Sequence, residues 1–403
     1  MANAHQAEGA AGPLRILHVT WRIDPALGGG PAAAIHMARA EAAMGIDATV
    51  AATRATSVDG PDPAVVDLAG IPGLLFRRDR FSPYSYSGAM RRWLRRHIRE
   101  FDLVEIHGVF NYPCLAAGVA ARRSATAYVL HPHGQLDPFD LRKHPLLKQA
   151  VGLLLVRPLV ARAQRVLTAS DREARRLETY GATARSQTLP LPYLVSGDGA
   201  DGEAFRAKYG LLGRRIVLFL GRIDYKKGLT YLIEAFSLVL GRFPDAILVL
   251  GGDDHSDYAA HLKERVLQME VREHVRFLGT LNTSEKNSAL AVASVLTLVS
   301  DNENYGLVLI EGAWWGVPMV ISKEVYIAPI LQKAGAALVV DRDAVSVEGA
   351  LTLLLGDDEL RRRMGNDGRK LARTVFSWTA VATKHAQLRE ELVTDRRTST
   401  LGA

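Results

Sequence analysis

The chain has 403 residues, of which 48% are hydrophobic and 23% are charged, with 35 glycines and 17 prolines. This length exceeds that of one typical domain, and the composition excludes disordered, collagen-like and coiled-coil proteins. The 50 lysines and arginines against 43 acidic residues give a formal net charge of +7. That balance suits an anionic ligand, an anionic membrane surface or nucleic acid, and charge alone does not choose among them.

The cysteine content and the lack of apolar segments bear on the cellular compartment. Cys114 is the single cysteine, so the chain can form no internal disulfide and no thiolate metal cage. Residues 1–13 lack a basic region followed by an apolar one, and apolar stretches such as 289–300 are shorter than the roughly 18 residues that a membrane span needs. We therefore expect a cytoplasmic protein with no spanning segment.

Short apolar runs alternate with helical patterns along the whole chain, which is typical of parallel strands joined by crossover helices. In the first half we expect strands at 14–19, 48–52, 103–106, 127–130 and 166–168. A stretch rich in glycine, 191–213, interrupts this pattern. In the second half we expect strands at 215–220, 247–250, 275–277, 295–299, 319–321 and 338–340. The sequence predicts an α/β protein with two parallel-sheet domains, in which ligands bind beyond the carboxyl ends of the strands.

Three consecutive glycines, Gly28, Gly29 and Gly30, follow the first strand and lead through Pro31 into a helix. Glycines allow backbone amides to approach a ligand, and a helix N-terminus attracts an anion. A tight strand-to-helix loop without a ligand is the alternative. A dinucleotide site is disfavoured, because the pattern G-x-G-x-x-G is absent and no acidic residue ends the second strand.

An arginine-rich segment interleaved with aromatic residues follows between 76 and 101. In its helical part, Trp93, Leu94, Ile98 and Phe101 are expected to face the core, with the arginines solvated outside. Attachment to an anionic membrane surface is the second interpretation and nucleic-acid binding a distant third.

Histidines follow two strands of the first half: His107 after one, and the run His131-Pro132-His133-Gly134 after the next. Each is either a functional group or a hydrogen-bonded loop histidine. We expect no metal site, because no further ligands share a readable spacing with His131 and His133.

The first strand of the second half is followed by Gly221-Arg222 and, before the next helix, by Lys227-Gly228. Arg222 leaves the strand end while Lys227 precedes the helix, so two cations and a helix N-terminus can converge on one diphosphate. A solvated basic loop is the alternative interpretation.

A third loop and helix come after the strand at 295–299. If the helix begins near Gly306, the amides of Tyr305, Gly306 and Leu307 point at a bound phosphate. Glu303 lies on the preceding loop and Glu311 about one turn inside the helix, so two carboxylates can accept hydrogen bonds from the hydroxyls of a nucleotide sugar. The alternative is a capping acid and a solvated helix residue.

Glu303 and Glu311 form an E-x7-E pattern, and the surrounding sequence closely resembles the signature of the family 4 retaining glycosyltransferases. The resemblance covers roughly residues 14–376 and includes the glycine loop, Gly221-Arg222, Lys227-Gly228-Leu229, Gly251-Gly252-Asp253 and the segment 275–279. It implies a GT-B fold, with two Rossmann-like domains facing each other across a cleft. An acceptor-side domain would span 14–195 and a nucleotide-sugar-binding domain 214–378, and a last helix at 379–396 would return to the first domain.

The resemblance also implies roles for single residues. Arg222 and Lys227 would stabilise the donor diphosphate, Glu303 would contact the donor sugar and Glu311 the ribose. A histidine of the first domain would lie near the reacting sugar, His133 before His107. The other substrate-binding residues implied are Asn304, the amides of Tyr305, Gly306 and Leu307 at the phosphates, Phe277 near the base, and Gly28, Gly29 and Gly30 in the first domain.

Taken together, the resemblance implies a retaining hexosyltransferase that needs no metal or cofactor and uses a nucleoside-diphosphate sugar as donor. The departing phosphate oxygen would help to deprotonate the acceptor hydroxyl. The acceptor would be a saccharide or lipid-linked saccharide in bacterial cell-surface polysaccharide synthesis, with the enzyme peripheral at the inner face of the plasma membrane and with no nucleic-acid partner. The alternatives are an inactive nucleotide-sugar-binding protein of the same fold and a two-carboxylate glycosidase, which would leave Arg222 and Lys227 unused. Two departures from the family pattern are Tyr305 in place of Phe and Trp314-Trp315 in place of small residues.

Overall fold

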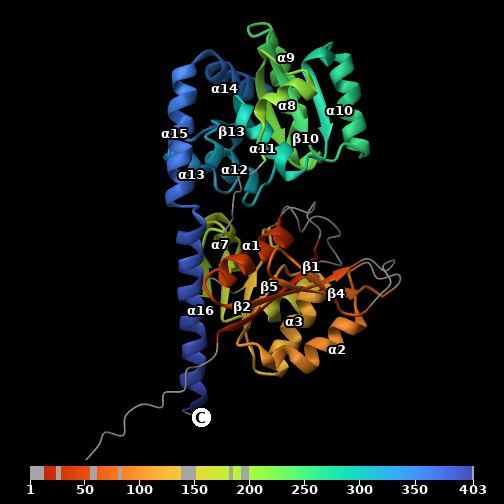
Figure 1. Ribbon diagram of the computed structural model, residues 1–403, viewed down its shortest axis with the longest axis vertical. Coiled ribbons are helices and arrows are strands. Elements are labelled where there is room, and N and C mark those ends of the chain that lie inside the picture. Colours follow the sequence, from red (N-terminus) through yellow and green to blue (C-terminus); the bar gives the residue numbers. More distant parts are fainter. Residues whose placement is uncertain are drawn as a thin grey trace, which may run out of the picture. The chain divides into compact units, whose positions relative to one another are not determined.

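The computed structural model describes residues 13–23, 29–54, 61–79, 84–137, 151–180, 185–191 and 199–401. Contacts divide the chain into two compact units. The first unit contains residues 1–168, 174–192 and 382–403, and the second contains 169–173 and 193–381. Each unit is built around its own β-sheet (Figure 1).

Among the described residues, the sheet of the first unit has eight strands in the order β3-β4-β2-β1-β5-β6-β7-β8. Their bounds are Arg15–Arg22 (β1), Asp47–Arg54 (β2), Ala64–Asp67 (β3), Pro72–Arg77 (β4), Leu103–His107 (β5), Ala127–His131 (β6), Arg165–Thr168 (β7) and Ser186–Thr188 (β8). The five strands predicted for this half are confirmed, whereas β3, β4 and β8 were not predicted.

The edge of this otherwise parallel sheet is formed by β3, which was not predicted and which pairs antiparallel with β4. A short turn joins the two strands, and the amide of Leu68 donates to the carbonyl of Ile71 over 2.9 Å. A turn of this length can connect only antiparallel neighbours, since a parallel pair needs a crossover of a dozen or more residues.

The helices of the first unit are α1 (Gly30–Ala42), α2 (Gly88–His97), α3 (Tyr112–Arg123) and α6 (Arg157–Ala161), which continues a π-helical turn at Gly152–Val156. Helix α7 (Asp171–Arg176) has its first residues in the second unit and its last residues in the first unit. The last helix, α16 (Trp378–Leu401), begins in the second unit and joins the first unit from Ala382 onward. Its Leu388 and Leu392 pack in one apolar cluster with Ile16 of β1 and Leu103 of β5.

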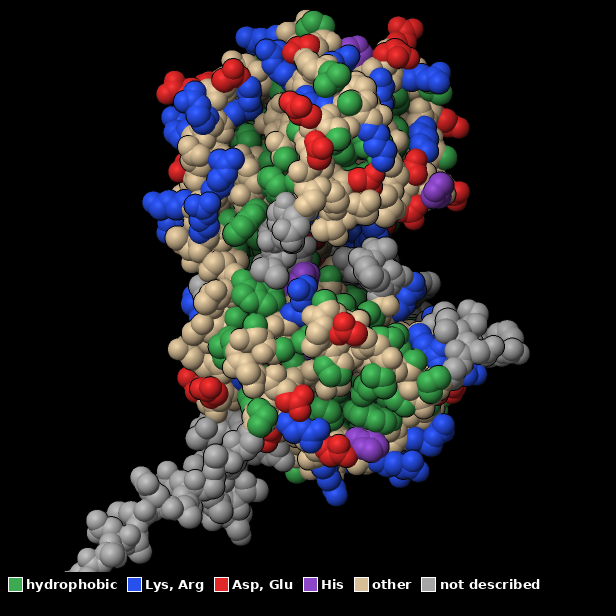
Figure 2. All heavy atoms as spheres, in the orientation of Figure 1, with side chains coloured by type: hydrophobic (Ala, Val, Ile, Leu, Met, Phe, Trp, Pro, Cys, Tyr) green, Lys and Arg blue, Asp and Glu red, His purple; other side chains and the backbone are tan. Residues whose placement is uncertain are grey.

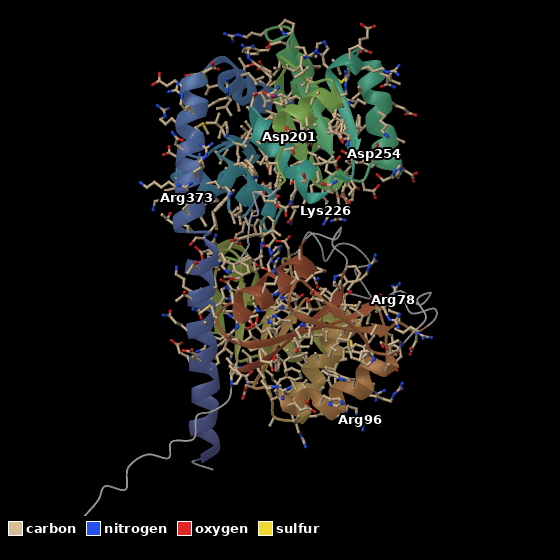
Figure 3. The ribbon with its side chains drawn as sticks, viewed as in Figure 1. Arg78, Arg96, Asp201, Lys226, Asp254 and Arg373 are labelled. Carbon is tan, nitrogen blue, oxygen red and sulfur yellow. The ribbon has the colours of Figure 1, made fainter. Side chains whose placement is uncertain are left out.

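Helix α2 presents its arginines to solvent. Leu94 of α2, with Ile98 and Phe101 just beyond it, is buried in the core of the first unit, and Trp93 packs against that core. Arg96 points outward from the helix in Figure 3, and Lys and Arg side chains gather in Figure 2 along the border where Figure 1 places α2. The predicted division of this segment into an apolar inner face and a solvated basic face is confirmed.

The second unit has a six-stranded sheet in the order β11-β10-β9-β12-β13-β14, in which every described pair is parallel. The strands are Arg215–Leu220 (β9), Ala246–Gly251 (β10), Val275–Gly279 (β11), Val295–Leu298 (β12), Met319–Ser322 (β13) and Ala337–Val340 (β14), and all six were predicted. The helices are α8 (Gly202–Tyr209), α9 (Leu229–Leu240), α10 (Asp257–Gln268), α11 (Thr283–Val292), α12 (Leu307–Trp315), α13 (Ala328–Lys333), α14 (Ala344–Gly356) and α15 (Asp358–Thr374).

The strand order of the second sheet reverses between β9 and β12. From β9 the chain proceeds outward to β10 and β11, and from β12 it proceeds the other way to β13 and β14. In open parallel sheets a crevice forms beyond the carboxyl ends of the strands at such a reversal. The loops after β9 and β12 are therefore the places in this unit where a ligand is expected. No helix within the described ranges has the length and hydrophobicity to cross a membrane.

Candidate functional site

The loops that follow β9 and β12 touch each other through their backbones. The amide of Asp301 donates to the carbonyl of Lys226 over 2.7 Å. A Cβ atom added to Gly228, whose φ is +62°, would lie 2.1 Å from the carbonyl oxygen of Val299. Glycine is thus required at 228 both by the left-handed backbone and by this close approach. The contact brings the segments 221–228 and 299–306 to the same place at the reversal of the sheet; Figure 3 labels Lys226 there.

Lys227 and Glu303 form an ion pair between Nζ and Oε2, with 16% and 18% of their side chains exposed. The Glu303 backbone is held in turn, because its amide donates to the Glu324 carbonyl over 3.3 Å and its carbonyl accepts from the Tyr326 amide over 2.9 Å. Among the described residues Oε1 of Glu303 has no hydrogen-bond partner. Lys227 and Glu303, which the sequence assigned to the binding of the donor substrate, therefore lie together. One carboxylate oxygen of Glu303 remains able to accept a hydrogen bond.

Helix α12 begins at Leu307 directly after this loop, as predicted. Its N-cap is Gly306, which has φ +67° and provides no side chain to cap the first amides. Those amides and the positive end of the helix dipole can accept an anion. The ring of Tyr305 is buried and meets Phe376 edge-on with 6.3 Å between ring centroids, so only the backbone of Tyr305 faces the loop.

Glu311, one turn into α12, has a buried side chain whose Oε1 pairs with Nζ of Lys286 from α11. The sequence analysis missed Lys286, because nothing in its local pattern separates it from an ordinary surface lysine on α11. The pair fixes a charged acceptor close to the start of α12. Trp314, on the same helix, is 41% exposed.

The remaining predicted residues of the second unit lie around these two loops. Arg222 is exposed, and its side chain makes no hydrogen bond or ion pair with any residue that the structure describes. Phe277 is half-buried in β11, with Nζ of Lys263 5.4 Å from its ring centroid. Asn304 donates from Nδ2 to Glu173 over 3.3 Å, so its side chain already has a protein partner.

In the first unit, His133 lies against the start of α1. Gly28 lies outside the described residues, Gly29 is the N-cap of α1 with φ +78°, and Gly30 is the first helical residue. A Cβ atom on Gly30 would lie 3.0 Å from Cδ2 of His133, so glycine allows the imidazole ring to rest there. His133 itself has φ +50°, a rare conformation for a non-glycine residue. Burial and the neighbouring His131 lower the pKa of His133 to about 3, so the ring is neutral at physiological pH.

His107 is buried and contacts His133. Its Nδ1 is 3.1 Å from Nε2 of His133, and its Nε2 is 3.1 Å from Nδ1 of His18 on β1. Nε2 of His18 lies 2.8 Å from Oε2 of Glu41 on α1. Burial and the adjacent histidines hold the pKa of His107 well below its usual range. His18 and Glu41 were not predicted, because a single histidine in a strand and a single glutamate in a helix have no distinguishing pattern.

Arg389 of α16 completes this buried polar cluster. Its Nη2 lies 2.7 Å from Oε1 of Glu41, and its Nε pairs with Oε1 of Glu105 on β5. Oε2 of Glu105 accepts from Nε2 of His131 over 3.0 Å. Burial alone would raise the pKa of Glu105, but the Arg389 guanidinium and the hydrogen bond from His131 hold it well below its usual range.

Among the described residues, the side chains with grouped metal-type ligand atoms are His18, Glu105 and His107, whose atoms lie within 4.8 Å of one another. The same nitrogen atoms and carboxylate are engaged in the hydrogen bonds just described, so a metal ion would have to replace them. The cluster is therefore described as a hydrogen-bond network. Asp254, in the loop after β10, is paired with Lys263 over 2.6 Å.

Two family models match the chain. The model described as Glycosyltransferase Family 4 matches residues 27–192, and the model described as Glycosyl transferases group 1 matches residues 201–371. The chain is 27% identical to a D-inositol 3-phosphate glycosyltransferase of Jonesia denitrificans, over 87% of this chain and 88% of the relative. It is 29% identical to a phosphatidyl-myo-inositol mannosyltransferase of Mycobacterium leprae, over 79% of this chain and 80% of the relative.

Solved structures with the same fold include HepE of Anabaena in complex with UDP and glucose, with a TM-score of 0.76 and 17% identity. That comparison covers 94% of this chain and all of HepE. Sucrose-phosphate synthase of Thermosynechococcus elongatus also has a TM-score of 0.76, with 20% identity over 95% of this chain and all of that chain. At these identities the likeness establishes the fold.

Proposed function

Since the chain belongs to the family 4 glycosyltransferases and has the GT-B fold, we propose that it transfers a sugar from a nucleoside-diphosphate sugar to an acceptor hydroxyl with retention of configuration. The observation that supports this proposal is the backbone contact at the reversal of the second sheet between the loop after β9, which carries Arg222 and Lys227, and the loop that leads to the uncapped start of α12. Lys227 is paired there with Glu303, while the Arg222 side chain has no hydrogen bond or ion pair among the described residues.

The chemistry required is the stabilisation of negative charge that grows on the diphosphate as the sugar departs. The Lys227 ammonium, which its pair with Glu303 holds in place, and the amides at the start of α12 are oriented hydrogen-bond donors, and Arg222 is available to add a planar, bidentate donor. Such preorganised groups stabilise the developing charge more than the ground state. No metal ion is needed for this role, and the departing phosphate oxygen can take the proton of the acceptor hydroxyl.

The two paired carboxylates fit hydrogen-bond acceptors for the donor. Oε1 of Glu303 is left for a hydroxyl of the sugar, and Glu311 is positioned by Lys286 for a ribose hydroxyl. A glycosidase would instead need one of the two as a proton donor. An ion-paired carboxylate accepts hydrogen bonds and does not donate a proton, so the arrangement favours transfer over hydrolysis.

The first experiment measures thermal stability with UDP, GDP, ADP, CMP and their sugar conjugates, on the wild type and on Arg222→Ala and Glu311→Ala. A ligand at about a hundred times its dissociation constant adds roughly 2.7 kcal/mol of stability. We expect one nucleoside diphosphate to stabilise the wild type selectively, and both variants to weaken that effect. Arg373→Ala, an exposed arginine on α15 labelled in Figure 3, is the matched control and is expected to respond as the wild type does.

Turnover is then measured with water as acceptor, because the natural acceptor is not needed for slow release of sugar from the donor. Arg222→Ala is expected to lower the rate about 100-fold, as loss of one preorganised donor does elsewhere, while nucleotide affinity changes less. The anomer released, observed by NMR before mutarotation, tests retention. Nucleotide binding without turnover would support the binding-only alternative, and release of sugar from an uncharged glycoside would support a glycosidase.

For the acceptor, we propose a saccharide or lipid-linked saccharide used in cell-surface polysaccharide synthesis, with the enzyme at the cytoplasmic face of the membrane. The name of one relative, a phosphatidyl-myo-inositol mannosyltransferase, supports an acceptor that is linked to lipid. Leu153, Leu154 and Leu155 expose 61%, 69% and 48% of their surface in the turn before α6, and α2 adds a basic face. Apolar and basic groups of this kind suit an anionic lipid surface.

Sedimentation with vesicles of phosphatidylglycerol and of phosphatidylcholine tests this attachment. We expect binding to the anionic vesicles alone, and a loss of binding in the double variant Leu153→Gln and Leu154→Gln. Leu238→Gln, at a 57% exposed leucine of α9, is the control for a polar substitution at an exposed leucine. Equal sedimentation with both lipids, or with neither, would remove the membrane from the proposal.

A further inference from the structure

Three histidines and one glutamate of the first unit form a single line of hydrogen bonds. From the inside outward, Glu41 contacts Nε2 of His18, Nδ1 of His18 contacts Nε2 of His107, and Nδ1 of His107 contacts Nε2 of His133, at 2.8, 3.1 and 3.1 Å. His18, Glu41 and His107 are buried, and His133 at the outer end is partly exposed. Nδ1 of His133 has no partner among the described residues.

In a line of neutral rings, the direction of every hydrogen bond follows from the inner end. An ionised carboxylate only accepts, so Nε2 of His18 must carry a proton. A neutral imidazole has one donor and one acceptor nitrogen, so Nδ1 of His18 accepts and Nε2 of His107 donates to it. By the same rule Nδ1 of His107 accepts from Nε2 of His133. The line thus ends with an unprotonated Nδ1 on His133.

We propose that Glu41, acting through His18 and His107, fixes the tautomer of His133 so that Nδ1 of His133 accepts a hydrogen bond from a hydroxyl of the acceptor other than the one that reacts. The inference rests on the proposed function for the identity of that hydroxyl. Glu41, His18 and His107 are positioning residues, and His133 is the group that touches substrate. This hydrogen bond orients the acceptor, and the proton of the reacting hydroxyl still leaves to the departing phosphate.

The inner end of the line is anchored by charge. Arg389 lies 2.7 Å from the carboxylate oxygen of Glu41 that does not contact His18, and it also pairs with Glu105. Glu105 in turn accepts from His131, which stacks on His107 with ring centroids 4.6 Å apart. The other titratable group nearby, His385 of α16, donates from Nε2 to the carbonyl of Pro190. Arg389 thus fixes the position of Glu41, which is the acceptor at the inner end of the line.

The outer end is held by shape. The His133 ring rests on Gly30, where any Cβ atom would approach it to 3.0 Å, and its backbone has φ +50°. Low pKa values keep both His133 and His107 neutral, as the alternation of donors and acceptors requires. A strained backbone and a tightly seated ring at a functional side chain are consistent with preorganisation.

Glu105→Gln offers a matched control for Glu41→Gln. Both substitutions remove one buried carboxylate from Arg389, but Glu41 contacts Nε2 of His18 at 2.8 Å, whereas Oε2 of Glu105 is 3.9 Å from Nδ1 of His18. His18→Gln is the second variant, because it interrupts the line and leaves the Glu41–Arg389 pair in place.

The test uses full-length protein labelled with ¹⁵N at histidine, and long-range ¹H–¹⁵N NMR with His133→Gln to assign the signal. We expect wild type and Glu105→Gln to hold His133 with its proton on Nε2 and no detectable Nδ1–H form. Glu41→Gln, whose amide can donate as well as accept, is expected to introduce a population with the proton on Nδ1. A wild-type His133 protonated on Nδ1, or an unchanged tautomer in both folded variants Glu41→Gln and His18→Gln, would overturn the inference.

Kinetics supply the second readout. Glu41→Gln and His18→Gln are expected to lower kcat/KM for the acceptor about tenfold, the effect of one hydrogen bond, with unchanged affinity for the nucleotide. Equal losses in Glu105→Gln would indicate a merely structural role and also overturn the inference. The NMR measurement needs no substrate, so a protein that binds no nucleotide but shows the fixed tautomer would contradict the proposed function alone.

Discussion

At the scale of single residues, the charged groups around α12 are paired before any ligand binds. Lys227 holds Glu303 and Lys286 holds Glu311, and each pair is largely shielded from water. Screening by solvent is weak at such sites, so removal of one partner takes a strongly interacting opposite charge away from the other. Side chains that are already oriented lose little conformational freedom when a ligand arrives.

Lys286→Met is therefore expected to lower the free energy of unfolding by about 2 kcal/mol, because Glu311 is buried and would lose its cation. Urea denaturation measures this change. Lys323→Met is the control: Lys323 pairs with Asp341, but about three-fifths of each side chain is exposed, so the expected change is below about 1 kcal/mol. Equal changes in the free energy of unfolding for the two substitutions would show that the buried Lys286–Glu311 pair stabilises the protein no more than the exposed Lys323–Asp341 pair does.

Gly228→Ala is expected to be strongly destabilising, by about 3 kcal/mol or more, since the new methyl group would collide with the Val299 carbonyl 2.1 Å away. Gly210→Ala separates this collision from backbone strain. Gly210 has φ +67°, similar to the +62° of Gly228, but nothing lies within 4 Å of its added Cβ, so about 1 kcal/mol is expected. Thermal unfolding compares the two. Similar losses would mean that the loops after β9 and β12 can separate at little cost.

At the scale of elements, α16 brings two buried titratable side chains into the first unit, His385 and Arg389. Burial and the nearby Arg389 lower the pKa of His385 to about 3. A group whose pKa is depressed by folding opposes folding when the unfolded chain takes up its proton. The stability of the first unit should therefore fall as pH drops below about 6.5, the ordinary histidine pKa, and continue to fall towards pH 3.

His385→Gln is expected to remove about 1 to 2 kcal/mol of the stability lost between pH 7 and pH 5, because the unfolded variant no longer binds this proton. Urea denaturation at both pH values gives the difference. His255→Gln, at a histidine with 92% of its side chain exposed, should leave the pH dependence as in the wild type. A wild-type pH dependence in His385→Gln would mean that His385 is charged in the folded protein.

The elements that the sequence predicted are those with long apolar runs. All six strands of the second sheet are of this kind, whereas β8 is the polar tripeptide Ser186–Thr188 and β4 begins with Pro72-Gly73, which disfavours a strand. The site residues next to strand ends could also be predicted from the sequence, because parallel strands align their carboxyl ends. The sequence did not predict Lys286, His18 or Arg389, because each of them contacts a partner that is distant in sequence. Arg389 and Glu105, for example, are 284 residues apart.

At the scale of the whole molecule, the units are not consecutive segments of the chain. The first unit is completed only by residues 382–403, which supply Leu388 and Leu392 to its apolar cluster and Arg389 to its two glutamates. The stability of the first unit thus depends on a segment that the chain reaches only after the second unit.

A fragment of residues 1–192 is expected to lack cooperative unfolding, because Glu41 and Glu105 would be buried without Arg389 and the apolar faces of Ile16 and Leu103 would be uncovered. The same fragment joined by a flexible linker to 378–403 is expected to unfold cooperatively. Circular dichroism during urea titration distinguishes the two, and cooperative unfolding of the shorter fragment would contradict this dependence.

The return of α16 also constrains how proteins of this architecture can exchange parts by recombination. Replacement of the second unit by that of a relative requires two crossover points, one near residue 192 and one near 382, because a single crossover would also replace the tail helix. In a chimera with one crossover, the last helix of the other parent would pack against Glu41 and Glu105 in place of α16. Productive single-crossover hybrids should thus be confined to parents whose last helix carries an arginine at the position of Arg389.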